Sequence, residues 1–345
     1  MKKIVLICII ILAISVLHAQ SNGNSDMDVT AVDIDLPGNI IIKQSTGTQM
    51  WSVKASNHNY TQYVHAEVVD GKLILYLDDS APQVNMGIQV EIQLPVLKEL
   101  SLHGTSDVLI ATRNEPQLSV LNYGTGNCNL TALNIGKFLE LHNNGTGTIK
   151  IVERLDMETG ESIPFIVPVV STESLLLHNS GTGNISLEAC SANSIVLNNQ
   201  GTGDVFANLL NTDTGTMTVQ NKGTGKINLL NLNAKLMELK NIGTGDVFLN
   251  GKAETLRLFC VGFGDIMAQS LVTKTAHITH SGAGQIKANV TDTAYISDSY
   301  FSNYSEVGKV EVTGGGKVVR EERLADKASD LGTEDVPMET THFLL

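Results

Sequence analysis

The stretch Leu197–Phe206 reads LNNQGTGDVF and decides the fold. It places a Gly-Thr-Gly turn between two short runs in which apolar and polar residues alternate. The turn recurs, with its first glycine at Gly124, Gly145, Gly181, Gly201, Gly223 and Gly243, and with variants at Gly104, Gly262 and Gly282. Seven of the eight intervals between successive first glycines are 19 to 22 residues long, which indicates a structural repeat.

Apolar residues hold fixed places around each turn. The positions four before the first glycine, four after it and six after it are apolar or Cys in every copy. This alternation on both sides of a turn predicts two short β-strands per repeat, each with one face inward. An antiparallel meander shares the alternation, but a winding chain also returns the same residue type to the same place in every coil. The sequence therefore predicts an all-β fold, a parallel β-helix or solenoid with coils of about 20 residues.

An asparagine stands two residues before the first glycine in six of the copies. Its place in the alternation puts it on the inward side, where an amide must be hydrogen-bonded. We therefore predict a buried structural ladder in which each amide bonds to the coils above and below. Its members are Asn122, Asn143, Asn179, Asn199, Asn221 and Asn241.

The turn itself has two predicted features. The glycines are expected to adopt positive φ, because a Cβ would be costly at such a corner. The threonines between them are expected to stack along the coils as a β-branched column, made of Thr125, Thr146, Thr182, Thr202, Thr224 and Thr244.

The ends of the chain depart from the repeat. Lys2 and Lys3 precede an apolar run that ends near Ala19, which predicts a signal peptide and export to the periplasm, the cell surface or the medium. The one long interval, of 36 residues, is a coil plus an insertion. We predict residues 1–19 as signal peptide, 20–27 as linker, 28–103 as irregular N-terminal β coils and cap, 104–290 as the regular solenoid with an insertion at 153–168, 291–319 as C-terminal cap and 320–345 as a flexible acidic tail.

Composition excludes several classes of function. The 345 residues carry 23 basic and 36 acidic side chains, a formal charge of −13, so a nucleic-acid partner is not expected. No segment after the leader reaches about 18 consecutive apolar residues, so we expect a chain that does not span a membrane. Cys128, Cys190 and Cys260 are odd in number, so at least one lacks an intramolecular partner; Cys128 and Cys260 stand at inward positions.

No catalytic or metal-binding pattern emerges from the repeat. Lys226 interrupts the column of Asp and Asn residues three after the glycine, which argues against a calcium ladder. No helix follows the glycines, so they do not form a phosphate cradle. The charged outward positions are expected to lie too far apart for a catalytic cluster: Glu140, Lys150, Glu238, Lys240, Arg257 and His277. We therefore predict no catalytic residues, no cofactor and no metal.

Four residues are candidates for surface binding. His142 and His178 hold equivalent positions in successive coils and are expected roughly 5 Å apart, where they either hold a metal or form a stacked, solvent-facing pair. Phe206 and Phe248 point outward, where they either stack on sugar rings or a protein partner or are ordinary exposed apolar residues. The apolar run 163–168 in the insertion either binds a partner or folds back over its own coil.

The glycine repeats, together with the lead-in Val90–Leu100 into Gly104–Val108, resemble a family of exported bacterial proteins. This is the family named "putative auto-transporter adhesin, head GIN domain", and the resemblance covers roughly residues 28–310. It implies a β-helical fold and a cell-envelope setting, and it brings no established catalytic residues.

The sequence as a whole favours an exported, non-enzymatic, adhesin-like solenoid that presents an extended recognition surface. The expected partner is an extracellular glycan or an envelope protein. Two alternatives stay open: a carbohydrate-active β-helix enzyme, which needs clustered acids in a cleft, and a purely structural envelope component.

Overall fold

A computed structural model of the chain describes residues 28–111, 113–131, 133–152, 170–209, 214–298 and 308–320. Several predicted segments lie outside the described residues. They are the signal peptide 1–19, the linker 20–27, the insertion 153–168 and the tail beyond residue 320.

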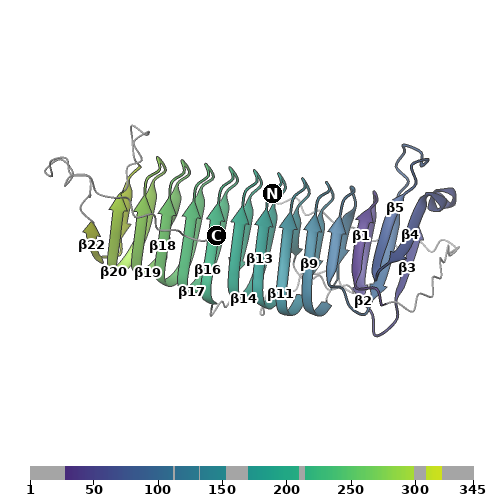
Figure 1. The fold of residues 1–345 in the computed structure, drawn as a ribbon, viewed down its shortest axis with the longest axis horizontal. Helices are drawn as coiled ribbons and strands as arrows, with labels where there is room; N and C mark the ends of the chain where they lie inside the picture. Colours follow the sequence, from purple (N-terminus) through teal and green to yellow (C-terminus); the bar gives the residue numbers. More distant parts are fainter. Residues whose placement is uncertain are drawn as a thin grey trace, which may run out of the picture.

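The chain forms a parallel β-solenoid of about 9 turns, with coils roughly 20 residues apart, which confirms the predicted fold class (Figure 1). Equivalent columns stack in register from coil to coil. Leu239, four before its turn glycine, pairs with Leu258 of the next coil, and Leu258 pairs with Ile278 of the coil after that. The described residues contain no α-helix and one 3-10 helix.

Each coil contributes to two sheets, which we call the pre-turn sheet and the post-turn sheet because one leads into the Gly-x-Gly turn and the other follows it. The pre-turn sheet contains β7 (Glu99–Leu102), β9 (Arg113–Asn122), β11 (Leu133–Asn143), β13 (Val170–Asn179) and β16 (Thr214–Asn221). The post-turn sheet contains β8 (Asp107–Ile110), β10 (Cys128–Thr131), β12 (Ile149–Val152) and β15 (Val205–Leu209). Strands that round the corner between the sheets belong to both: β14 (Ile185–Asn199), β17 (Ile227–Asn241), β18 (Val247–Cys260), β19 (Ile266–His280) and β20 (Ile286–Asp298).

The inward columns of both sheets meet in one hydrophobic core that runs the length of the solenoid. All twenty-seven residues of the three apolar columns are at most 2% exposed. Outward neighbours on the same strands are exposed or half-buried, as in β17, whose burial alternates along its length. The period-2 pattern of the sequence is therefore the pattern of burial.

The six asparagines of the Asn column are fully buried. The Nδ2 of Asn179 donates to the Oδ1 of Asn199 at 3.1 Å and to the carbonyl of Gly203 at 3.0 Å. Asn199 repeats both bonds one coil further, to Asn221 at 3.2 Å and to the Gly225 carbonyl at 3.2 Å. Each amide thus joins its own coil to the next, and it satisfies a turn carbonyl that would otherwise be buried without a partner.

The turn glycines do not have positive φ, so that part of the sequence prediction is wrong. Glycine is required there because the backbones of successive coils approach each other closely. A Cβ on Gly201 would lie 2.0 Å from the carbonyl oxygen of Gly181, and one on Gly203 would lie 1.9 Å from that of Gly183. Backbone packs directly on backbone at the turn, and any side chain would separate the coils. The threonine between the glycines points outward and is exposed in all six copies.

Replacing Gly201 with Ala tests this packing against a control in the same solenoid. The new Cβ overlaps backbone that cannot move without breaking the turn hydrogen bonds, so Gly201→Ala should lose at least about 1–3 kcal/mol of unfolding free energy. Gly215 lies in β16 with nothing within 4 Å of an added Cβ. Gly215→Ala should be neutral or slightly stabilising. Urea unfolding midpoints of both variants measure the difference, and equal midpoints would contradict the packing argument.

The N-terminal coils are not stacked in sequence order. Strand β1 (Ala31–Asp35) lies between β5 (Lys72–Leu77) and β7, and β2 (Asn39–Gln44) lies between β6 (Gln89–Leu94) and β8. The first coil of the chain is therefore enclosed by later coils, unlike the regular repeats, where each coil stacks on the one before it.

Antiparallel strands cover the N-terminal end of the solenoid (Figure 1). Strand β3 (Met50–Lys54) pairs antiparallel with β6, and β4 (Val64–Val69) pairs antiparallel with β5. The 3-10 helix η1 (His58–Tyr63) connects β3 to β4. At the other end, β21 (Val310–Thr313) and β22 (Lys317–Arg320) pair with the two halves of β20.

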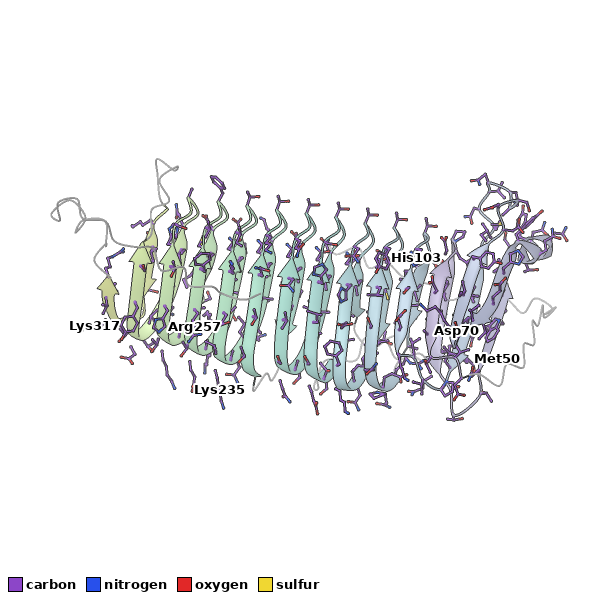
Figure 2. All side chains as sticks on the ribbon, in the orientation of Figure 1. Met50, Asp70, His103, Lys235, Arg257 and Lys317 are labelled. Atoms are coloured by element: carbon purple, nitrogen blue, oxygen red, sulfur yellow. The ribbon has the colours of Figure 1, made fainter. Side chains whose placement is uncertain are left out.

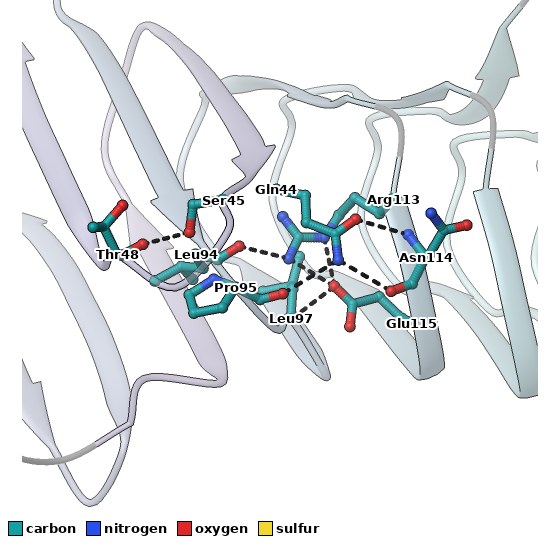
Figure 3. A network of polar contacts seen from close by, with 9 residues as sticks. All are labelled: Gln44, Ser45, Thr48, Leu94, Pro95, Leu97, Arg113, Asn114 and Glu115. Atoms are coloured by element: carbon teal, nitrogen blue, oxygen red, sulfur yellow. Dashed lines mark hydrogen bonds and ion pairs between the residues drawn. The ribbon is translucent and has the colours of Figure 1, made fainter.

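A buried polar network holds the segment that crosses from β6 to β7 past the enclosed first coil (Figure 3). The guanidinium of Arg113 donates to the Oε1 of Glu115 and, at 3.1 Å, to the carbonyl of Leu94. The same carboxylate oxygen accepts from the backbone N–H of Leu97 at 3.0 Å. Both charged side chains are essentially fully buried. The ion pair therefore fastens both ends of the crossing segment to β9.

The side chain of Gln44 completes this network where the first coil leaves the stack (Figure 3). Its Nε2 donates to the carbonyls of Pro95 at 3.2 Å and Asn114 at 3.1 Å, and its Oε1 accepts from the N–H of Asn114 at 3.0 Å. One amide side chain thus bridges backbone groups of two segments at the corner.

Removing one partner of the Arg113–Glu115 pair should be costly, because it leaves the other charge buried and unpaired. We expect Glu115→Leu to lower the unfolding free energy by about 3–5 kcal/mol. The double variant Arg113→Leu/Glu115→Leu has no stranded charge and should lie much closer to wild type. Denaturant unfolding followed by circular dichroism measures both. A double variant as unstable as the single one would show that the charges themselves are not the decisive feature.

Candidate functional site

The outward columns of the pre-turn sheet carry a continuous strip of polar, charged and aromatic side chains. One column runs from Asn198 through Gln220, Lys240 and Phe259 to Thr279, each paired with the next. The adjacent column runs from Thr218 through Glu238, Arg257 and His277 to Tyr295. We call these ten residues the pre-turn strip. Their order follows from the register, because every strand is held by the packed column behind it.

Contacts between successive coils organise the strip. An Nη1 of Arg257 lies 2.9 Å from the Oε1 of Glu238. The ammonium of Lys240 lies 5.3 Å from the centroid of the Phe259 ring, within the range of a cation–π interaction. The His277 and Tyr295 rings stack with centroids 5.0 Å apart and planes inclined by 11°. Side chains that are exposed to solvent are thereby held in defined relative positions.

The strip encloses a depression of about 420 Å³ that is open to solvent. All of its residues except Tyr295 line this depression. One of them, Arg257, is labelled in Figure 2. Glu238 supplies the one carboxylate among the lining residues, and it forms an ion pair with Arg257. A ligand in the depression would meet amide, hydroxyl, cationic and aromatic groups.

The expectation that the outward charged residues are too far apart is wrong for four of the six. Glu238, Lys240, Arg257 and His277 come from three successive coils and line the same depression. The signal was present in the sequence, since these residues occupy the same two columns in consecutive copies of the repeat. Glu140 and Lys150 lie in other coils and do not line it.

His142 and His178 lie near the middle of the pre-turn sheet (Figure 1). The two residues pair in register between β11 and β13, with ring centroids 5.4 Å apart and planes inclined by 41°. The Oε1 of Glu140 lies 4.0 Å from the Nε2 of His142. Within the ranges that the structure describes, no three His, Cys, Asp or Glu side chains are placed to hold a metal ion.

The pKa of His178 is lowered from its usual value by burial and, to a smaller degree, by repulsion from His142. The folded state therefore resists protonation of this ring more than the unfolded chain does. Unfolding then takes up a proton as the pH falls below about 6.5, the ordinary pKa of histidine. The contribution of His178 to stability is present above that pH and is lost below it.

Unfolding midpoints measured at pH 5 and pH 7.5 test this linkage. We expect wild type to lose more stability between the two values than His178→Asn, which places at this position the residue found one coil further along the column. Asn198→Gln changes that neighbouring position without removing a titratable group and should keep the wild-type dependence. An unchanged slope in His178→Asn would show that another group controls stability in this range.

Phe206 and Phe248 lie on the post-turn sheet, so the structure does not bring them together with the histidine pair. Asn228 stands between them in the same outward column, paired with Phe206 on one side and Phe248 on the other. Phe206 is half-buried, whereas Phe248 is 37% exposed and lies beside Met267 of the next coil. The two rings are two coils apart and do not form one continuous aromatic surface.

The column three residues after the glycine, considered above for calcium, bonds to backbone. The Oδ1 of Asp204 accepts from the N–H of Lys226 at 2.7 Å, and that of Asp265 accepts from the N–H of Gln285 at 2.7 Å. The N–H of Gly201 donates back to the preceding coil, whereas that of Val205 donates forward to the next. Because the direction reverses, the N–H of Asp204 has no carbonyl partner, and the Oδ1 of Asn184 in the preceding coil accepts from it at 2.7 Å. This second ladder was not predicted from the sequence.

The three described cysteines are free and buried. Burial raises the pKa of the Cys128 and Cys190 thiols to about 12 and that of Cys260 to about 11. All three thiols are therefore protonated at neutral pH, and none provides a nucleophile. Cys260 occupies the Asn column in its coil, paired with Asn241.

The family model described as "Putative auto-transporter adhesin, head GIN domain" matches the chain over residues 28–212 and 208–315. The chain belongs to this family. No curated protein matches the chain. The match confirms the resemblance that the glycine repeats and their lead-in indicate, and it spans the regular coils and the N-terminal end together.

Several solved structures are similar to this member of the head GIN domain family at low sequence identity. A crystal structure named "putative adhesin" from Bacteroides fragilis is 16% identical, covers 85% of this chain and 93% of its own, and has a TM-score of 0.23. One with the same name from Parabacteroides distasonis is 15% identical, with the same coverage and a TM-score of 0.39. A "putative lipid binding protein" from the same organism is 16% identical, covers 85% and 93%, and has a TM-score of 0.27.

No helix within the described residues is long and apolar enough to cross a bilayer.

Proposed function

We propose that this protein is an exported, non-enzymatic, adhesin-like recognition protein of the cell envelope, and that it binds an extracellular glycan or an envelope protein through the pre-turn strip. The observation that carries the proposal is the open depression on the pre-turn sheet, lined by side chains of successive coils in register. Membership of the family named for an adhesin supports an exported or surface setting.

The geometry of the strip supports binding more than catalysis. Glycoside hydrolysis generally uses two carboxylic acids that face each other across the scissile bond. The depression is lined by one carboxylate, Glu238, which already forms an ion pair with Arg257. The remaining polar groups are hydroxyls, amides, the cations of Lys240 and Arg257 and the His277 imidazole, so no second carboxylate faces Glu238 among the lining residues.

Rigidity favours recognition on this surface. Each outward side chain is flanked on its strand by inward residues of the packed columns; Lys240, for example, stands between Leu239 and Asn241, both at most 2% exposed. A ligand therefore meets groups whose backbone positions are already fixed, so little ordering entropy is lost on binding.

A binding screen with substituted chains tests the proposal. The chain is presented to an array of extracellular glycans and envelope proteins, and each hit is measured again with Arg257→Ala and Phe259→Ala. Loss of a central contact should weaken binding at least tenfold, or roughly 1.4 kcal/mol. Phe248→Ala on the post-turn sheet is the matched control and should bind as wild type does.

Two outcomes would contradict the proposal. Binding that depends on Phe248 and not on the strip would move the recognition surface to the other sheet. Depolymerisation of a bound polysaccharide, retained in Phe248→Ala and lost in Glu238→Gln, would instead identify a carbohydrate-active enzyme.

A further inference from the structure

The C-terminal half of the solenoid carries a cluster of cations that contrasts with the acidic chain as a whole. Five exposed basic side chains belong to β17, β18 and β19, and two exposed or half-buried carboxylates, Glu238 and Glu254, lie among them. The basic residues are Lys235, Lys240, Lys252, Arg257 and Lys274. Figure 2 labels Lys235 at the lower edge of the sheet and Arg257 on its face. The cluster thus extends from the corner of the coils onto the pre-turn strip.

Ion pairs inside the cluster leave it cationic. Glu238 pairs with Arg257 at 2.9 Å, and Glu254 pairs with Lys274 at 3.2 Å. With Asp246 and Asp265 of the intervening turns included, residues 226–280 carry six cations against four carboxylates, a positive excess in a chain of formal charge −13. A concentration of one sign against the overall charge attracts ligands of the opposite sign to that place.

We infer that the depression of the pre-turn strip binds an acidic polysaccharide, one whose sugar units carry carboxylates. The inference rests on the proposed function and specifies its ligand class. Lys240 and Arg257 would meet the carboxylates, while the amides of Asn198 and Gln220 and the hydroxyls of Thr218 and Thr279 would meet the sugar hydroxyls.

The lining explains why a glycan fits better than other polyanions. Amides and hydroxyls outnumber the cations in the depression, and such groups recognise neutral hydroxyls as well as charge. The Phe259 ring in the depression and the Tyr295 ring beside it offer apolar faces of the kind on which pyranose rings pack.

The repeat also suits an extended polymer. Successive coils advance by about 4.8 Å, the spacing of neighbouring strands in a sheet. A pyranose unit in an extended chain has a similar length, so each sugar of a polysaccharide lying along the solenoid axis can meet equivalent positions of successive coils. The strip supplies such positions over four pairs of neighbouring residues in each column.

Calorimetry with hyaluronate, alginate and polygalacturonate, each beside its carboxyl-reduced form, tests the inference. At least one acidic form should bind, and carboxyl reduction should weaken it at least tenfold. Lys240→Gln/Arg257→Gln should weaken the acidic form by a similar factor, and affinity should fall as salt is raised.

The control variant Lys150→Gln/Lys287→Gln removes the same charge from exposed or half-buried positions of the post-turn sheet and should change affinity less than twofold. Thermal midpoints of both double variants should stay near that of wild type, because the four side chains lie outside the core.

Three results would overturn the inference. Equal loss in both double variants would mean attraction by overall charge alone. Equal affinity for single-stranded DNA or for phosphatidylserine vesicles would mean unspecific binding of polyanions. Binding of the carboxyl-reduced forms as tightly as the acidic ones, with loss in Phe259→Ala, would reject the acidic ligand while leaving the proposed recognition through the strip intact.

Discussion

Direct contact between the backbones of successive Gly-x-Gly turns is the constraint on which the rest of the solenoid depends. The carbonyl of Gly181 occupies the space where a side chain of Gly201 would stand, so the coils approach at the distance of paired strands even at the corner. That contact sets the register of the coils. With the register set, Asn199 donates to the side chain of Asn221 and to the Gly225 carbonyl, both in the next coil. The same register stacks the apolar columns on one another. A side chain in place of either turn glycine would disturb all three at once.

The regular part of the fold follows from the sequence because one physical arrangement explains every column of the repeat. The reason for the glycines does not follow, since a residue that needs positive φ and one that needs contact with another backbone are both written as Gly. The stacking order of the N-terminal coils could not be predicted from the sequence either. Val32–Leu36 shows the same alternation whether its strand lies at the end of the stack or between β5 and β7, and Arg113 and Glu115 reveal their roles only through burial.

The candidate site shows a different limit. Lys240 and Phe259 were visible as outward residues of neighbouring repeats, and stacking alone places them side by side. A catalytic site needs convergent acids, whereas a recognition surface needs complementary groups in series, and a lysine beside a phenylalanine matches only the second pattern. The Asp and Asn column likewise matches a calcium ladder in its residue types, although its side chains bond to backbone. The hydrogen bond of Asp204 to the N–H of Lys226 becomes apparent only once the reversal in backbone bonding at the turn is known.

A β-solenoid separates the residues that determine the fold from those that contact a ligand. On β18 the inward residues Leu256 and Leu258 are fixed by the columns above and below, whereas Arg257 between them projects into solvent. An outward residue can therefore change from one coil to the next without altering the core, and its position is still set by its inward neighbours. This explains how one regular scaffold carries a histidine pair on two coils and a cationic, aromatic strip on the coils that follow. Recognition by such a protein depends on which coils carry which outward residues, and the number of coils sets the length of ligand that it can contact.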